Sequence, residues 1–142
     1  MSEEREELKA IDIMSSPVYT ISPTSTVYEA AKIMADNNVG SLVVVEGTRP
    51  IGIVTKGDLV KKVLAKGRNP ASVVVGEIMS TPLLYVEPTT PILEVAKIMA
   101  RSNIRHLPVI EGQKLLGIVT DRDILSVAPT MIEVLTVKRG RS

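Results

Sequence analysis

The chain contains the stretch GIVTKGD at residues 52–58 and the stretch GIVTDRD at residues 117–123. Working outward from this pair at the same offset of 65, residues 13–60 align with residues 78–125 without a gap. Of these 48 aligned positions, 22 are identical. Chance similarity does not produce such a match, so the chain carries an internal duplication.

Both copies predict the same order of secondary structure. A short apolar run that ends at a proline suits a short strand, and apolar residues then recur at helical spacing. Two β-branched runs joined by a Glu-Gly turn indicate a hairpin, and a second helix follows. In copy one, strands are expected at 18–21, 42–45 and 51–54, and the helices are expected to end near 37–38 and at Gly67. In copy two, strands are expected at 83–86, 107–110 and 116–119, and the helices are expected to end near 102–103 and at Pro129.

The duplication also predicts the architecture. One unit of about 50–60 residues buries too little surface to be stable alone. We therefore expect two β-α-β-β-α units, of the mixed α/β (α+β) class, packed sheet to sheet around a pseudo-two-fold axis. The expected segments are an N-terminal polar segment (1–9), a first domain (10–67), a linker (68–76) with three valines tied down against one of the units, a second domain (77–129) and a C-terminal tail (130–142).

The composition argues against several classes of site. The chain has no cysteine and one histidine, His106, so neither a disulfide nor a clustered metal site is expected. Its 17 basic and 16 acidic residues nearly cancel and only three residues are aromatic, so a nucleic-acid surface is not expected either. No apolar run reaches the length of a membrane span, and the acidic N-terminus lacks the features of a signal peptide. We therefore expect a cytoplasmic protein.

Two Thr-x-x-Asp pairs, Thr55 with Asp58 and Thr120 with Asp123, lie where a strand gives way to a helix. Such a pair serves as a helix cap in many proteins. A carboxylate beside a hydroxyl can also accept hydrogen bonds from the vicinal hydroxyl groups of a ribose, and a helix N-terminus offers N–H groups to a phosphate. From the residues alone the cap is the simpler interpretation, and both stay open.

The duplicated unit resembles a pair of cystathionine β-synthase (CBS) domains, the arrangement called a Bateman module. The resemblance covers about residues 10–128 and rests on the Ile-Met motifs at 13–14 and 78–79, the two Gly-x-x-Thr-x-x-Asp stretches and the segment 103–109. It implies that an adenosine nucleotide (AMP, ADP or ATP) binds in the cleft between the two copies. With this resemblance, ribose binding is favoured over a helix cap, and the residues implied to hold the ribose are Thr55, Asp58, Thr120 and Asp123.

Further residues are implied by the resemblance around the other parts of the nucleotide. Because the copies differ at several of these positions, we expect two sites of unequal affinity. For the apolar members of the set, a place in the core is the alternative. The residues implied to face phosphate are Lys56, Arg105, His106 and Arg122, and those implied to line the adenine pocket are Ile21, Pro23, Val39, Gly40, Ser41, Val86, Pro88 and Ile104.

Together these features favour a regulatory, ligand-sensing module that signals to a partner by a change of conformation. An enzyme is not expected, because the sequence lacks a nucleophile motif, a P-loop and a metal cluster. The alternatives are a structural adaptor or dimerisation module without a ligand and a sensor of another adenosyl compound, such as S-adenosylmethionine. No cofactor is expected beyond the regulatory nucleotide. The resemblance also implies a homodimer, with an unidentified effector protein as the partner.

Overall fold

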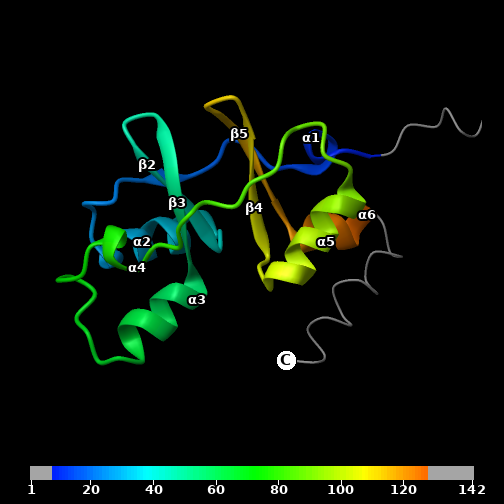
Figure 1. Cartoon of the computed structure of the whole chain (residues 1–142). Coiled ribbons are helices and arrows are strands. Elements are labelled where there is room, and N and C mark those ends of the chain that lie inside the picture. Colours follow the sequence, from blue (N-terminus) through cyan, green and yellow to red (C-terminus); the bar gives the residue numbers. More distant parts are fainter. Residues whose placement is uncertain (1–7, 128–142) are drawn as a thin grey trace, which may run out of the picture. The chain divides into compact units, whose positions relative to one another are not determined.

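A computed structural model describes residues 8–127, which divide into two compact units (Figure 1). We call residues 18–84 the first-copy unit, and residues 8–17 together with 85–127 the second-copy unit. The expected tail 130–142, the helix end at Pro129 and most of the segment 1–9 lie outside the described residues.

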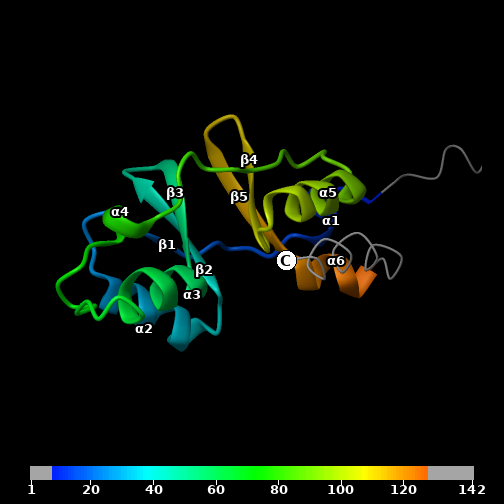
Figure 2. The ribbon, with the colours of Figure 1, turned by 60° about the horizontal axis from the view of Figure 1, so that its bottom comes forward.

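The first-copy unit is a small mixed sheet with helices. Its sheet has the order β1-β2-β3, in which β1 runs parallel to β2 and β2 antiparallel to β3. Helices α2 and α3 lie side by side in it (Figure 2). The elements are β1 (Thr20–Ile21), α2 (Val27–Asn37), β2 (Ser41–Glu46), β3 (Arg49–Thr55), α3 (Lys56–Leu59), the π-helical segment η2 (Val60–Leu64) and α4 (Val75–Ile78).

The second-copy unit repeats this plan around the antiparallel hairpin β4-β5. Its elements are α1 (Ala10–Ile13), α5 (Ile92–Ser102), β4 (His106–Glu111), β5 (Lys114–Thr120) and α6 (Asp121–Val127). The mixed fold of two α/β units expected from the sequence is thus confirmed. No helix among residues 8–127 is both long and apolar enough to cross a bilayer.

The main difference from the sequence-based prediction is that residues 83–86, where a strand was expected, do not form one. In copy one, the Val43 N–H donates to the Tyr19 carbonyl at 3.2 Å, which helps to hold β1 against β2. The residue equivalent to Val43 is Pro108, which has no N–H to donate. Only a single parallel bridge between Val86 and Val109 remains, so copy two has no counterpart of β1 as a strand.

The turns and helix ends follow the sequence signals. Both α2 and α5 are followed by an asparagine in the left-handed conformation, Asn38 and Asn103, each with φ of 54°. Both hairpins turn at a glycine with φ of 65°, Gly47 in copy one and Gly112 in copy two. A left-handed conformation at these places is readily adopted by glycine and asparagine, so the residue types fix the turns.

Each unit is completed by a short helix that precedes the other copy in the sequence. Helix α4 belongs to the first-copy unit, where Val75 and Ile78 are buried in the core. Helix α1 belongs to the second-copy unit, where Ala10 is fully buried. The compact units therefore differ from the expected domains 10–67 and 77–129, because the linker packs into the first-copy unit and residues 8–17 pack into the second-copy unit.

Backbone pairing beyond these helices explains the glycine of each repeated stretch. Ser80 exchanges hydrogen bonds of 2.8 and 3.3 Å with Ile53, and Ser15 exchanges bonds of 2.9 and 3.0 Å with Ile118. A Cβ atom on Gly52 would lie 2.9 Å from the Ser80 carbonyl oxygen. A Cβ atom on Gly117 would lie at the same distance from the Ser15 carbonyl oxygen. The Ile-Met-Ser motif of each copy thus packs against the Gly-Ile-Val-Thr stretch of the other copy, and only glycine leaves room for it.

Candidate functional site

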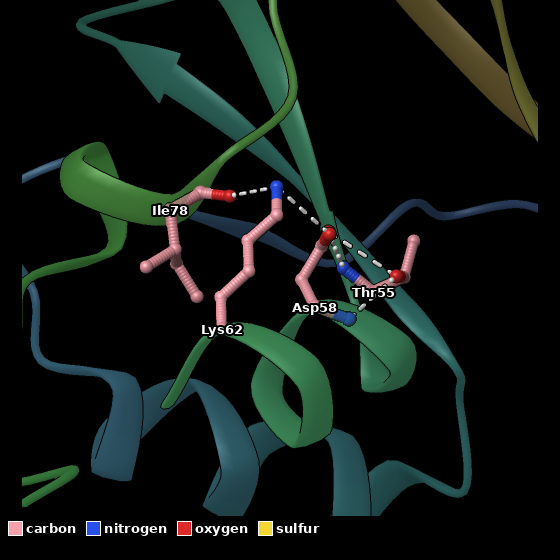
Figure 3. A network of polar contacts seen from close by, with 4 residues as sticks. All are labelled: Thr55, Asp58, Lys62 and Ile78. Atoms are coloured by element: carbon pink, nitrogen blue, oxygen red, sulfur yellow. Dashed lines mark hydrogen bonds and ion pairs between the residues drawn. The ribbon is translucent and has the colours of Figure 1, made fainter. Parts of the chain in front are cut away.

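Thr55 and Asp58 join the end of β3 to the start of α3. The carboxylate Oδ2 of Asp58 accepts hydrogen bonds from the Thr55 N–H at 2.9 Å and from the Thr55 hydroxyl at 3.2 Å. The Asp58 N–H in turn donates to the Thr55 hydroxyl oxygen at 3.2 Å. This reciprocal arrangement is a capping box, which fixes the position of the carboxylate at the helix N-terminus (Figure 3).

The second carboxylate oxygen of Asp58 is also engaged. Its Oδ1 lies 3.1 Å from the Nζ of Lys62, and the same Nζ donates to the carbonyl oxygen of Ile78 at 2.9 Å (Figure 3). The Asp58 side chain is 13% exposed, whereas Lys62 is 44% exposed. In the first-copy unit both oxygens of the carboxylate are therefore held by protein groups.

Thr120 and Asp123 reproduce the capping box between β5 and α6. Oδ2 of Asp123 accepts from the Thr120 N–H at 2.7 Å and from its hydroxyl at 3.1 Å, and the Asp123 N–H donates to that hydroxyl at 3.3 Å. The position equivalent to Lys62 is Val127, which has no charge. Within residues 8–127, no hydrogen bond or ion pair is found for Oδ1 of Asp123. Among the described residues, therefore, only Oδ2 of this partly buried carboxylate accepts a hydrogen bond.

Both interpretations of the Thr-x-x-Asp pairs are compatible with this geometry. The helix cap is observed in both units and uses one carboxylate oxygen. A carboxylate has two oxygens with about four lone-pair sites, so a cap leaves acceptor capacity for a ligand. The cap also holds the carboxylate in one orientation, so a ligand that used the remaining oxygen would meet a pre-oriented acceptor.

The cationic residues expected near a phosphate have different surroundings. Lys56 and Arg122 are exposed, on the first turns of α3 and α6. Arg105 lies with its Nε 4.0 Å from an oxygen of Asp121, and its carbonyl accepts the Asp121 N–H at 3.1 Å. The Arg105 side chain is 64% exposed, so this ion pair is a weak surface contact. His106 is half-buried at the start of β4, where it pairs with Thr120 across the hairpin.

The residues expected around an adenine occupy several kinds of position. Ile21, Val86 and Pro88 are buried, and Val39 and Ile104 pack against the two cores. The carbonyl groups of Pro23, Pro88 and Gly40 accept backbone hydrogen bonds of 2.8 to 3.0 Å. Ser41, only 7% exposed, pairs with Thr55 in the β2-β3 ladder. These positions have structural roles, and their contact with a ligand stays a prediction.

One residue at this site was missed by the sequence reasoning. Lys62 follows Asp58 by four residues, which is the spacing at which side chains meet on a helix. That spacing was a usable signal, since copy two has a valine at the same place. The contact of Lys62 with the Ile78 carbonyl was not predictable, because it depends on how α4 packs.

Comparison with known proteins shows the family. A CBS domain model matches residues 10–65 and again residues 75–129. An uncharacterised protein of Methanopyrus kandleri is 42% identical over 123 residues, which cover 85% of this chain and 63% of that protein. The chain therefore spans less than two thirds of this curated relative.

Solved structures agree with the match. The hexameric CBS-CP12 protein from bloom-forming cyanobacteria is 39% identical with a TM-score of 0.82, over 87% of this chain and 74% of that chain. The CBS domain pair of protein MJ0100, solved in complex with 5′-methylthioadenosine and S-adenosyl-L-methionine, is 29% identical with a TM-score of 0.80, over 88% of this chain and 98% of that chain. This chain belongs to the CBS domain family and carries two CBS domains in tandem.

Proposed function

We propose that this chain is a regulatory module that binds an adenosyl compound, with the ribose held at the Thr-x-x-Asp turns. The observation that carries the proposal is the carboxylate of Asp123, which is fixed by Thr120 through Oδ2 while Oδ1 has no partner among the described residues. A pre-oriented acceptor of this kind suits the two neighbouring hydroxyl groups of a ribose.

Residues close to the two turns in the sequence are proposed to bind the phosphate groups of an adenosine nucleotide. Lys56 and Arg122 are exposed and precede Asp58 and Asp123 by two residues and one residue in the sequence, so we propose them as contacts for a phosphate group. The proposed ligands are AMP, ADP and ATP. S-adenosylmethionine and 5′-methylthioadenosine are the second candidates, because the structurally similar domain pair of protein MJ0100 was solved with both.

The proposed output is regulatory and not catalytic. Ligand binding shifts an equilibrium between conformations, by no more than the ligand's difference in affinity for them. An effector protein in the cytoplasm would respond to that shift, and a homodimer is the proposed assembly. The hexameric state of the cyanobacterial CBS-CP12 protein makes higher assemblies a measurable alternative.

Isothermal titration calorimetry tests the proposal. Protein freed of co-purified ligand by unfolding and refolding is titrated with each of the five adenosyl compounds. At least one should bind, and binding should disappear in the double variant Asp58→Asn/Asp123→Asn. Asparagine can keep the carbonyl that accepts the cap hydrogen bond, while it replaces the other oxygen by a donor, so it removes ligand acceptors with little loss of the cap. Absence of binding by any compound would favour the adaptor.

A further inference from the structure

We infer that Lys62 limits ribose binding at Asp58, so that an adenosyl ligand fills the Asp123 site first. The inference deepens the proposed function and rests on it. It makes Lys62 a specificity-determining residue that acts through Asp58, and it assigns the inequality of the two sites to one position of the duplicated sequence.

The count of hydrogen-bond acceptors at Asp58 is the first argument. Oδ2 already accepts two hydrogen bonds from Thr55, and Oδ1 carries the ion pair with Lys62. Two ribose hydroxyl groups would have to share these oxygens with a cation or displace it. A hydroxyl group also makes a charge-assisted hydrogen bond to a carboxylate, but the ammonium group adds a positive charge 3.1 Å from Oδ1 that a neutral ribose does not supply, so the ribose competes at a disadvantage.

The anchoring of Lys62 is the second argument. Its Nζ donates to the Ile78 carbonyl at 2.9 Å in addition to its contact with Asp58 (Figure 3). The ammonium group is thus held from two sides, by α3 and by the last residue of α4. A ligand that displaces it breaks two contacts, unlike the case of a lysine that rests on a single surface carboxylate.

The backbone beneath Lys62 is the third argument. Residues Val60–Leu64 form a π-helical turn, in which the Ala65 N–H donates to the Val60 carbonyl at 2.8 Å. The equivalent helix of copy two, α6, is α-helical throughout its described length. A π-helical turn is rare and is frequently found at functional sites. Within the part of the two helices that the structure describes, position 62 and its equivalent 127 therefore differ in backbone as well as side chain.

The test measures affinity at the Asp58 site alone, in a protein whose other site is blocked by Asp123→Asn. Adding Lys62→Met removes the ammonium group but keeps a side chain of similar length. We expect this change to increase affinity for the compound that wild-type protein binds by about 3- to 10-fold, and tenfold corresponds to about 1.4 kcal/mol. Lys62→Arg keeps the positive charge and should leave the affinity low.

Two controls separate this effect from a change in net charge or in folding. Lys61→Met makes the same charge change at an exposed neighbour and should not alter the affinity. In the background Asp58→Asn, Val127→Lys should weaken binding at Asp123, because a lysine four residues after an aspartate reaches it on a helix. A merely structural role for Lys62 predicts a loss of affinity on substitution, not a gain.

The outcomes are distinguishable from failure of the proposed function. If wild-type protein binds and Lys62→Met leaves the Asp58 site unchanged, the inference is wrong while the proposed function stands. If Lys62→Met abolishes binding at that site, the inference is also wrong, and Lys62 contacts the ligand directly. If wild-type protein binds no adenosyl compound, both fall together.

Discussion

The two units share a framework but not the charges placed on it. Leu42 and Leu107 lie at equivalent positions of the two hairpins, and both are fully buried. At the strand-to-helix turns, Asp58 is paired with Lys62, whereas Asp123 has a valine at the equivalent place. A duplicated sequence can therefore keep one core while its two surfaces acquire different chemistry, since buried positions are limited by shape and exposed positions are not.

The largest effect should come from the shared cores. Leu42→Ala and Leu107→Ala each remove a fully buried side chain, so each should lower the free energy of unfolding of its unit by about 2–5 kcal/mol. Chemical denaturation with urea measures both losses. Similar losses would support the equivalence of the two cores. A loss in only one variant would contradict that equivalence.

The crossing segments should give the next largest effect. Gly52→Ala and Gly117→Ala place a Cβ atom 2.9 Å from a backbone carbonyl oxygen, so each should destabilise the protein by about 1–3 kcal/mol. Gly57→Ala is the matched control, because the nearest atom to its Cβ would be the Thr55 hydroxyl oxygen at 3.6 Å. This helical position should instead gain up to about 1 kcal/mol. Thermal unfolding distinguishes the three variants.

The caps should contribute equally in both units. Thr55→Ala and Thr120→Ala each remove a hydroxyl that accepts a helix N–H at 3.2 or 3.3 Å. Each change should cost about 0.5–2 kcal/mol in urea unfolding, and the serine variants should restore most of it. A loss of stability in one unit alone would show that the two caps have the same geometry but do not contribute equally to stability.

The smallest predicted effect concerns the start of α4. The guanidinium of Arg68 donates to Glu77 at 2.8 Å and, with the Val74 N–H, holds the pKa of that carboxyl below its ordinary value. A lowered pKa means that the contact stabilises the fold above the unfolded pKa of about 4.3, and that this contribution is lost as the pH falls through the folded pKa. The equivalent residue in α1 is Asp12, with no ion pair among the described residues.

Titration of Glu77 by NMR checks this point. Arg68→Gln should raise the Glu77 pKa toward its ordinary value and reduce the acid dependence of stability that comes from this residue. Lys66→Gln, an exposed charge change nearby, should leave the titration of Glu77 nearly unchanged. An identical Glu77 titration in the Arg68→Gln variant would contradict the assigned cause.

Much of this fold was predictable from the repeat, because the positions that build helices, hairpins and turns keep their residue types in both copies. The helix ends at Asn38 and Asn103 are examples. The exchange of α1 and α4 between the copies was not predictable, since it depends on packing across a long stretch of sequence. Nor did the local pattern at 83–86 reveal that Pro108, far along the chain, removes a hydrogen-bond donor from the neighbouring strand.

The candidate site was only partly predictable for a related reason. The Thr-x-x-Asp pairs were found because they repeat, but their dual use as caps required the observed geometry. Four of the apolar residues expected around an adenine, namely Ile21, Val39, Val86 and Ile104, lie in or against the cores, and their contact with a ligand stays a prediction. Sequence patterns identify the residue types at a turn. Which hydrogen bonds each carboxylate oxygen already accepts from the protein becomes known only from the folded structure.

The affinity of each site, measured separately for the same ligand, tests the central claim most directly. Asp58→Asn leaves only the Asp123 site, and Asp123→Asn leaves only the Asp58 site. Calorimetry with the compound that wild-type protein binds most tightly should give a dissociation constant about 3- to 10-fold lower for Asp58→Asn than for Asp123→Asn, because Lys62 competes only at Asp58. Equal constants for the two variants, or tighter binding by Asp123→Asn, would contradict the account.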